Sequence, residues 1–351
     1  MVIPEKDIYE FLQSQNQPVI IYGTGNGADK IIAEFERRNI DIGGIAASDD
    51  FVRGQSFHGM EVKKISEFEL SFGKLVIIIA FGTCLPDVME RIFRLSQQHT
   101  VLAADVPVYG SNIWCREFYE ENRCDIEKAY SLFADDQSRF VYDSIIRFKL
   151  TGKMEYLRQC YSGKKEVFTE LLPLCSEESY LDLGAYRGDT IDELLSYTNG
   201  KYKKITALEP DRKTFAKLKK HTEGMKNIRL FRMGIWSEDR DLSFSDSLGR
   251  GSSFSENGGD TLAVTKIDTL FAVQETTYIK MDVEGCERQA IIGGINTLRR
   301  DKPKLNIAVY HRSEDIFSIP LQIHSVEPSY KLYLRQHPYI PAWDLNLYAI
   351  S

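Results

Sequence analysis

One stretch near the middle of the chain limits the fold more than any other, because a short apolar strand runs directly into a glycine turn and an amphipathic helix. Its sequence is Tyr180-Leu-Asp-Leu-Gly-Ala-Tyr-Arg-Gly-Asp-Thr-Ile-Asp-Glu-Leu-Leu195. Gly184 and Gly188 keep side chains out of the turn, and Asp189 or Thr190 is expected to cap the helix. Asp182 stands near the carboxyl end of the strand, where open α/β sheets place their ligand crevice, and its carboxylate can accept from an ammonium group. The stretch therefore predicts a nucleotide-type site on a parallel sheet.

The same order of strand, acid and helix recurs downstream. Lys204-Ile-Thr-Ala-Leu208 runs into Glu209-Pro210-Asp211, where Glu209 suits the hydroxyls of a ribose and Asp211 is expected to cap the next helix. Thr277-Tyr-Ile-Lys-Met-Asp-Val-Glu-Gly285 is a further buried strand that ends in acids and a glycine. At least five strands alternate with helices from residue 179 onward, so we expect a mainly parallel sheet. Residues 330–335 and 345–350 follow each other without a helix and predict a closing antiparallel pair.

Three of these segments, in this order, carry a resemblance. Leu-Asp-Leu-Gly-Ala (181–185), Leu-Glu-Pro-Asp (208–211) and Ile-Lys-Met-Asp-Val-Glu-Gly-Cys-Glu (279–287) resemble the FkbM family of S-adenosylmethionine-dependent methyltransferases. The resemblance covers about residues 130–351 and implies a class I methyltransferase fold, Rossmann-like, over residues 176–351, with S-adenosylmethionine as cofactor. It implies these cofactor-binding residues: Asp182, Gly184 and Gly188 at the methionine end, Glu209 at the ribose, Trp236 near the adenine, and Asp282.

Methyl transfer to oxygen needs alignment, exclusion of water and removal of the nucleophile's proton. His311, Asp282 and Glu284 are the titratable residues expected at the ligand-facing ends of the fourth and fifth strands. His311 is the first candidate for the base because an unperturbed imidazole titrates near neutrality. Asp282 and Glu284 could instead orient the acceptor or bind a hard cation, but two carboxylates alone do not predict a metal site.

A separate Rossmann-like α/β domain is expected over residues 1–110. Val19-Ile-Ile-Tyr22 is a buried strand, and the following Gly23-Thr-Gly25-Asn-Gly27-Ala28 fits the Gly-x-Gly-x-x-Gly/Ala turn, so Gly23, Gly25 and Ala28 are candidates to bind a nucleotide. Further strands are expected at 42–46, 74–80 and 101–104. The segment resembles small Rossmann-like domains that precede sugar-modifying transferase domains, which implies a nucleotide-linked sugar as ligand. A dinucleotide, or a docking domain without ligand, remains an alternative.

A helical connector is expected over residues 111–175. Ser138 is the expected cap of one of its helices, and we expect the connector to cover the entrance of the second domain. Tyr156, Tyr161 and Phe168 either line that entrance or belong to the core. The polar insertion at 243–260 predicts a mobile loop beside the ligand end of the sheet.

The composition limits partners and compartment. A net charge of -7 argues against nucleic acid bound by general electrostatics. The start lacks a basic segment followed by an apolar one, and the longest apolar run, near 75–81, is of strand length, so we expect a cytoplasmic protein without membrane insertion. Six cysteines without a Cys-x-x-Cys pair predict neither a zinc site nor disulfides. The sequence leaves open whether the chain forms a homo-oligomer.

Taken together, the motifs predict an S-adenosylmethionine-dependent O-methyltransferase, and the resemblances suggest a saccharide or sugar-bearing metabolite as acceptor. Two alternatives stay open. The first is an NAD(P)-dependent oxidoreductase that uses the turn at Gly23. The second is a non-catalytic nucleotide-sugar binding module, which the uncommon Tyr186-Arg187 inside the first glycine turn leaves open.

Overall fold

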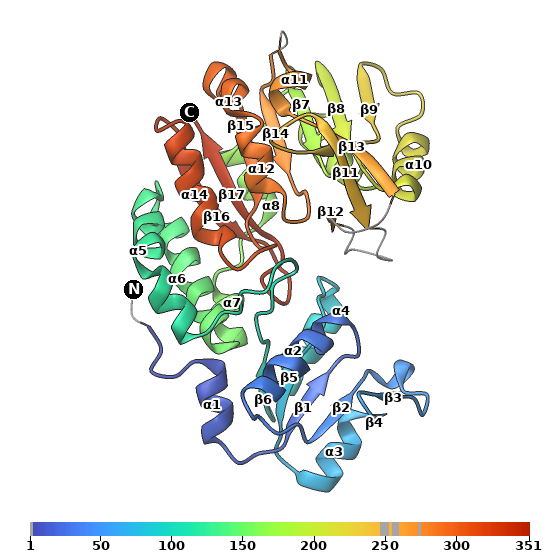
Figure 1. Ribbon diagram of the computed structural model, residues 1–351, viewed down its shortest axis with the longest axis vertical. Coiled ribbons are helices and arrows are strands. Elements are labelled where there is room, and N and C mark those ends of the chain that lie inside the picture. The colour runs from blue at the N-terminus through green and yellow to red at the C-terminus, as the bar shows by residue number, and fades with distance from the viewer. Residues whose placement is uncertain (1–2, 246–252, 255–259, 273–274) are drawn as a thin grey trace.

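The computed structural model describes residues 3–245, 253–254, 260–272 and 275–351. The described residues form two larger sheets flanked by helices, a small third sheet, and a group of helices that lies between the two larger sheets in the sequence (Figure 1). No helix in these described ranges is both long enough and apolar enough to cross a membrane. All six cysteines are free thiols.

The N-terminal sheet has six strands in the order β3-β4-β2-β1-β5-β6. Its strands are β1 (Val19–Tyr22), β2 (Gly44–Ala46), β3 (Ser56–Phe57), β4 (Met60–Lys63), β5 (Val76–Ile79) and β6 (Thr100–Leu102), and its helices are α1 (Ile8–Ser14), α2 (Asn26–Arg37), α3 (Ile65–Phe72) and α4 (Pro86–Leu95). Every residue of β1 is buried, because it pairs in parallel with β2 on one side and β5 on the other. The four strands predicted here are confirmed. The β3-β4 hairpin was not predicted, because its short, partly exposed strands lack an apolar run.

The connector is helical, as expected, with α5 (Arg116–Leu132), α6 (Asp136–Thr151), α7 (Met154–Gln159) and α8 (Lys164–Glu166). α5 packs against α14 (Asp315–Val326), and α6 packs against β16 (Lys331–Gln336) at the edge of the second sheet. The expected cap at Ser138 is wrong. Asp135 is the N-cap, and its carboxylate accepts from the Ser138 backbone N–H at 2.8 Å. The Ser138 hydroxyl instead accepts from the backbone N–H of Leu334 at 2.9 Å, so it helps to fix the helix to the sheet.

The three aromatic residues named for the connector lie in different surroundings. Phe168 is buried and packs against Tyr197 and Tyr348, so it belongs to the core. Tyr161 lines a cleft of about 740 Å³ between α4 and the segment at Pro338, and none of the acids at the strand ends lines that cleft. Tyr156 is half-buried beneath the guanidinium of Arg147. Phe168 therefore fits the core alternative, whereas the lining of an entrance by Tyr156 and Tyr161 stays a prediction.

The second sheet has seven strands in the order β16-β17-β15-β14-β7-β8-β9. Its further strands are β7 (Ser179–Leu183), β8 (Lys204–Leu208), β9 (Ile228–Phe231), β14 (Tyr278–Met281), β15 (Lys304–Ala308) and β17 (Leu345–Ile350), and its other helices are α9 (Asp189–Tyr197), α10 (Arg212–His221), α11 (Ile267–Leu270), α12 (Glu287–Ile292) and α13 (Ile295–Asp301). β9, β8, β7, β14 and β15 run parallel, whereas β17 pairs antiparallel with both β15 and β16. The class I methyltransferase arrangement predicted from the sequence is confirmed.

The direction of chain progress reverses at β7. From β7 the chain moves to β8 and β9 on one side, and β14 and β15 later fill the other side. Open α/β sheets bind ligands at such a switch point, outside the carboxyl ends of the strands. Asp182 on β7 and Lys280 on β14 are register partners immediately before this end.

A small four-stranded sheet, β10-β13-β11-β12, follows β9. It contains β10 (Gly234–Ile235), β11 (Arg240–Ser245), β12 (Ser253–Phe254) and β13 (Asp260–Thr265). The predicted mobile loop at 243–260 is wrong at its described ends, which belong to β11, β12 and β13. Residues 246–252 and 255–259 of that loop lie outside the described residues.

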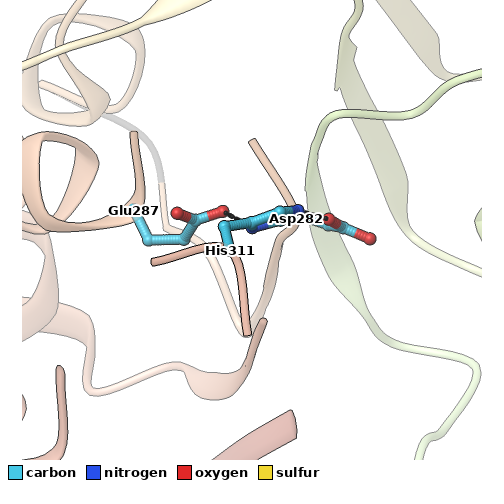
Figure 2. A group of neighbouring side chains, drawn as sticks. All are labelled: Asp282, Glu287 and His311. Atoms are coloured by element: carbon cyan, nitrogen blue, oxygen red, sulfur yellow. Dashed lines mark ion pairs between the residues drawn. The ribbon is translucent and has the colours of Figure 1, made fainter. Parts of the chain in front are cut away.

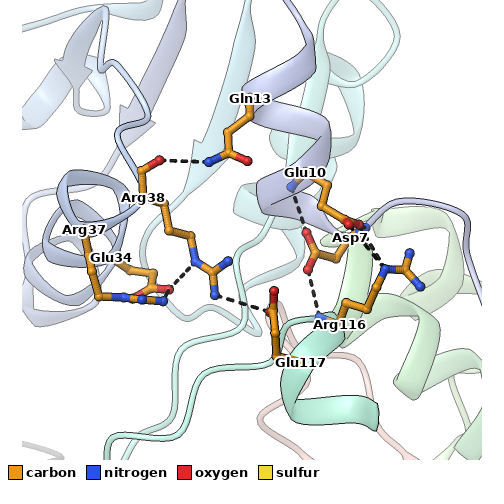
Figure 3. A network of polar contacts seen from close by, with 8 residues as sticks. All are labelled: Asp7, Glu10, Gln13, Glu34, Arg37, Arg38, Arg116 and Glu117. Atoms are coloured by element: carbon orange, nitrogen blue, oxygen red, sulfur yellow. Dashed lines mark hydrogen bonds and ion pairs between the residues drawn. The ribbon is translucent and has the colours of Figure 1, made fainter.

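Polar contacts join the helices beside the N-terminal sheet to the rest of the chain. Figure 3 shows α1, α2 and the start of α5 meeting: the Arg116 backbone N–H donates to Asp7 at 2.8 Å, and the Arg38 guanidinium lies 2.5 Å from Glu34 and 3.9 Å from Glu117. A second connection is a β-bridge between Thr83 and Ile340, whose backbone groups exchange two hydrogen bonds of 2.7 and 2.9 Å.

Candidate active site

Asp182 is a fully buried acid with an unused acceptor at the switch point. The Thr190 hydroxyl donates to its Oδ2 at 2.5 Å, but its Oδ1 has no hydrogen-bond partner among the residues that the structure describes. Burial raises the pKa of Asp182 to about 6, although the nearby Lys280 ammonium opposes this shift. Thr190 therefore does not cap α9, whose N-cap is Gly188 without a side-chain cap, and the predicted capping by Asp189 or Thr190 is wrong.

The structure explains why positions 184 and 188 of the turn are glycines, which the sequence alone did not show. Gly184 has a φ of +83°, and a Cβ there would overlap the carbonyl oxygen of Asp282 in the neighbouring loop. A Cβ at Gly188 would lie 2.6 Å from the His221 ring. Between them Tyr186 has a φ of +47°, with its exposed ring beneath the Arg187 guanidinium. Gly184 is thus required by close approach within the protein, and Gly188 by its φ of +99°, whether or not a ligand binds.

Glu209 joins the end of β8 to this turn. Its two carboxylate oxygens accept from the backbone N–H groups of Tyr186 at 3.0 Å and Asp211 at 2.9 Å. Burial raises the pKa of Glu209 to about 7, and the two backbone donors oppose that shift. Each carboxylate oxygen keeps a second lone pair, so Glu209 is held in place and can still accept from a ligand hydroxyl. Asp211 caps α10 by accepting from the Thr214 N–H at 2.7 Å, as predicted.

Trp236 lies against the small sheet. Its backbone N–H donates to Thr265 on β13 at 2.9 Å, and the Arg240 guanidinium lies 5.9 Å from the centre of its half-buried ring. Its carbonyl oxygen approaches Gly293 at the end of α12 so closely that a Cβ there would overlap it. The role of Trp236 beside an adenine stays a prediction.

The three residues predicted as catalytic candidates lie together. His311 Nε2 is 3.3 Å from Asp282 Oδ1 and 3.4 Å from Glu284 Oε2, and its Nδ1 is 2.9 Å from Oε1 of Glu287 (Figure 2). His311 and Glu287 are each only 1% exposed, whereas the side chains of Asp282 and Glu284 are 33% and 39% exposed. The cluster thus has a buried end at Glu287 and an open end at the other two acids.

These carboxylates change the protonation of His311. Burial alone lowers the pKa of the imidazole, but Glu287, Asp282 and Glu284 outweigh it and raise the pKa to about 10. This shift favours the charged imidazolium over the neutral imidazole that a general base requires, and the catalytic role of His311 stays a prediction. Burial raises the pKa of Glu284 to about 7, with His311 opposing the shift. Lys280 and His311 hold the pKa of Asp282 below its usual value despite burial.

Three residues of this site were missed. Lys280 is buried on β14, with its Nζ 3.5 Å from Asp282 Oδ2 and 3.3 Å from the Gly184 carbonyl oxygen. Glu287 begins α12 and accepts from the Val283 N–H at 2.9 Å. Tyr109, from the segment between β6 and α5, donates its backbone N–H to the His311 carbonyl at 2.9 Å. A lysine inside an apolar strand was a usable signal, but nothing local to Tyr109 linked it to a residue so far along the chain.

The N-terminal glycine turn is formed as predicted. Gly23 has a φ of +130°, Gly25 is the N-cap of α2 with open space around a would-be Cβ, and Ala28 is buried. Gly27 is fixed by packing, since a Cβ there would lie 2.8 Å from the Ala80 carbonyl oxygen. Nucleotide binding by Gly23, Gly25 and Ala28 stays a prediction.

Comparison with known proteins agrees with this geometry. Residues 182–340 match the family model described as "Methyltransferase FkbM domain". The crystal structure of methyltransferase FkbM from Methylobacillus flagellatus KT shares 22% identity over 99% of this chain and 94% of its own, with a TM-score of 0.73, which shows a common fold. No match was found among curated protein sequences.

More distant structures match only part of the chain. Aeropyrum pernix fibrillarin, in complex with S-adenosyl-L-methionine, has 15% identity over 50% of this chain and 68% of its own, with a TM-score of 0.32. An rRNA methylase from Streptococcus thermophilus has 14% identity over 51% and 89%, with a TM-score of 0.34. Likenesses this low say nothing about activity. The match at 182–340 spans Asp182, Glu209 and the His311 cluster, so this part of the chain is an FkbM methyltransferase domain.

Proposed function

We propose that the protein is an S-adenosylmethionine-dependent O-methyltransferase that acts on a hydroxyl of a saccharide or a sugar-bearing metabolite. One observation carries the proposal. Within an FkbM methyltransferase domain, acids at the carboxyl ends of β7, β8 and β14, together with His311 after β15, converge on one side of the switch point. Because these strands are parallel neighbours, cofactor and acceptor can meet across their ends.

The cofactor half of the site fits S-adenosylmethionine. The unpartnered Oδ1 of buried Asp182 is an acceptor suited to the ammonium of the methionine end. Glu209, fixed by two backbone donors, is suited to the ribose hydroxyls. When bound, the cofactor supplies an electrophilic methyl group on a sulfonium. The chain's part is to hold that group in line with the acceptor and to exclude water.

The acceptor half contains the proton-transfer groups. We assign the base to Glu284 rather than His311, because a pKa of about 7 lets Glu284 be ionised yet still accept a proton at neutral pH. The charged imidazole of His311, between Asp282 and Glu284, keeps the two acids oriented and partly neutralised. The Glu284 carboxylate would take the proton of the acceptor hydroxyl while the methyl group passes from the sulfonium to that oxygen, which leaves a neutral thioether.

The sugar acceptor and the compartment are proposed from the sequence. The acceptor class follows from the resemblance of the N-terminal domain to domains that precede sugar-modifying transferases. The glycine turn at Gly23 and Gly25 supports a nucleotide-linked sugar. We place the reaction in the cytoplasm, as the sequence predicts.

The test is acceptor-dependent turnover. The full chain is incubated with methyl-labelled S-adenosylmethionine and a panel of free sugars, nucleotide-linked sugars and oligosaccharides, and S-adenosylhomocysteine is measured by chromatography. We expect product with at least one sugar, and a loss of about 100-fold or more in kcat for Glu284→Gln. Glu223→Gln, which changes an exposed acid of the same domain, should leave the rate unchanged.

Two outcomes would favour the alternatives. Binding of S-adenosylmethionine without acceptor-dependent product across the panel would favour a non-catalytic binding module. Reduction of NAD(P) by the same sugars, with no methyl transfer, would favour an oxidoreductase that uses the N-terminal turn.

A further inference from the structure

We propose that Tyr109 is a positioning residue for Glu284, and that through it the N-terminal part of the chain helps to hold the proposed base. The inference rests on the proposed function, because it concerns the same acid. Tyr109 lies in the segment between β6 and α5, which passes the loops of the second sheet on its way to α5 (Figure 1). Glu284 lies far along the chain, in the loop between β14 and α12.

Tyr109 contacts both the proposed base and the residues beside it. Its backbone N–H donates to the His311 carbonyl oxygen at 2.9 Å, and the centres of the two rings are 6.1 Å apart. Its ring covers Gly285, where a Cβ would lie 3.1 Å from Cδ2 of Tyr109. A side-chain hydrogen bond joins Tyr109 to the Glu284 carboxylate. Because the phenol is the donor to an ionised carboxylate, this bond favours the charged form of Glu284.

The backbone of Glu284 requires support from its surroundings. Its φ is +55°, in the left-handed region that residues with a side chain rarely adopt. Such conformations persist only where the neighbouring structure holds them, and they are frequent at active sites. The next residue, Gly285, has a φ of +87°, and its carbonyl oxygen accepts from Arg312 Nε at 2.9 Å. The Tyr109 ring and the Arg312 guanidinium thus both hold the turn that carries Glu284.

The segment around this tyrosine is itself held from two parts of the chain. On α2, beside the N-terminal sheet, the Lys30 ammonium donates to the carbonyl oxygens of Pro107 at 2.7 Å and Val108 at 2.9 Å. In the second domain, the Ser313 carbonyl oxygen accepts from the Trp114 indole N–H at 3.0 Å. Because α2 follows the N-terminal glycine turn, one short path of contacts joins that turn to the proposed base.

The groups that face Glu284 determine what the contact does. Burial raises the pKa of Glu284 to about 7, and His311 opposes that shift. The acids Asp282 and Glu287 raise the pKa further, whereas the Tyr109 hydroxyl lowers it. Two other titratable groups nearby stay uncharged because burial raises the pKa of each: the Cys286 thiol and the Tyr310 hydroxyl. Removing the Tyr109 hydroxyl should therefore leave less of the base ionised at neutral pH.

The first test is the pH profile of Tyr109→Phe. Phenylalanine keeps the ring over Gly285 and the backbone bond to His311, and it removes only the hydroxyl. Loss of one hydrogen bond to a carboxylate should raise the pKa of Glu284 by about one unit. The variant's kcat/KM should then be about 8-fold lower than that of the wild type at pH 6.5 and nearly equal to it at pH 9. A loss of the same size at both pH values would show a merely structural role and overturn the proposal.

Tyr202→Phe is the matched control. The Tyr202 hydroxyl donates to the Lys226 carbonyl oxygen at 2.6 Å, so this change also removes one hydrogen bond of a tyrosine. Tyr202 precedes β8 and lies at the opposite edge of the sheet from the strand ends that carry the site. Its pH profile should coincide with that of the wild type.

Lys30→Met tests the connection to the N-terminal part of the chain. It should lower kcat/KM at pH 6.5 at least about 2-fold, with the loss again smaller at pH 9. If Lys30 acts through the Tyr109 hydroxyl, the variant with both changes should be no slower than Tyr109→Phe alone. Losses that multiply in the double variant would refute this connection.

A readout without turnover separates the inference from the proposed function. In the full chain, isotope-labelled at the glutamate carboxyl carbons, the NMR signal of Glu284 is the one missing from Glu284→Gln. Its titration midpoint should rise by about one pH unit in Tyr109→Phe and stay unchanged in Tyr202→Phe. Equal midpoints in Tyr109→Phe and a methyl-transferring wild type would overturn the inference alone. A raised midpoint in a chain without methyl transfer would refute the proposed function alone.

Discussion

Replacing Asp182 by asparagine should make the unliganded protein more stable and the cofactor site weaker. The carboxyl of Asp182 is completely buried, and its pKa is about 6 in place of 3.8. At about 1.4 kcal/mol per pH unit, its ionisation is therefore about 3 kcal/mol less favourable in the folded than in the unfolded protein. The replacing asparagine is neutral, and its amide oxygen could still accept from Thr190.

The stability difference between Asp182→Asn and the wild type should depend on pH, because folding raises the pKa of the Asp182 carboxyl. A carboxyl whose pKa is raised by folding stabilises the protein while it is protonated and loses that contribution as pH rises through the folded pKa. Asp182→Asn should therefore exceed the wild type in unfolding free energy by about 3 kcal/mol at pH 8 and by only about 1 kcal/mol at pH 4.5. The other buried acids with raised pKa values, such as Glu209, are present in both proteins and cancel in the comparison.

Urea unfolding at the two pH values measures the difference in unfolding free energy, and calorimetric titration measures the affinity for S-adenosylhomocysteine. Loss of the charged acceptor should weaken S-adenosylhomocysteine about 10- to 100-fold, as expected for one charge-assisted hydrogen bond. Asp192→Asn, an exposed acid on the following helix paired with His221, is the control and should stay within about 0.5 kcal/mol. An Asp182→Asn protein that is less stable at pH 8, or whose advantage does not change with pH, would refute the reasoning.

Other contacts give three more predictions. Gly184→Ala should lower the unfolding free energy measured in urea by about 3 kcal/mol or more, because the new Cβ overlaps the Asp282 carbonyl oxygen at a φ of +83°. The control Gly163→Ala, which has open space around its Cβ, should change the unfolding free energy by less than about 1 kcal/mol. Equal effects of the two substitutions would contradict the clash. Asp135→Ala should lower the unfolding free energy by about 3–5 kcal/mol, because it removes the N-cap of α6 and the ion-pair partner of buried Arg335. The control Asp136→Ala changes a side chain that is 99% exposed and should alter the unfolding free energy by no more than about 0.5 kcal/mol. An equal loss of stability in Asp136→Ala would show that the pair with Arg335 is unimportant. The rate kcat/KM should rise with pH through about 7 as Glu284 loses its proton, and a residual rate in Glu284→Gln that keeps this rise would exclude Glu284 as the base.

The sequence predicted the strands and their order well where apolar runs ended in glycine or an acid. β1, β7, β8 and β14 each combine four or five mostly apolar residues with such an ending, and the structure has them with nearly the predicted bounds. The caps were harder, because Asp135 and Ser138 both fit an N-cap and only the contact of Ser138 with the distant strand β16 decides between them. The β3-β4 hairpin lacked the apolar run that would have predicted it.

The site was predicted in part. Asp282, Glu284 and His311 were found because strand ends meet at one edge of a parallel sheet. The protonation of His311 could not be inferred, since it depends on Glu287, which lies on the buried side of the imidazole. The close packing that requires glycine at position 184 could not be inferred from the sequence either, because the atom that its Cβ would meet is the carbonyl oxygen of Asp282, far away in the sequence.

The most direct test of the account is calorimetric titration of the full chain with S-adenosylhomocysteine and S-adenosylmethionine, with NAD as comparison and Glu209→Ala as the control for the site. We expect micromolar binding of both adenosyl ligands, at least about 10-fold weaker binding in Glu209→Ala, and no competition from NAD. Binding of NAD alone, or adenosyl binding that is unchanged in Glu209→Ala, would contradict the proposed cofactor site.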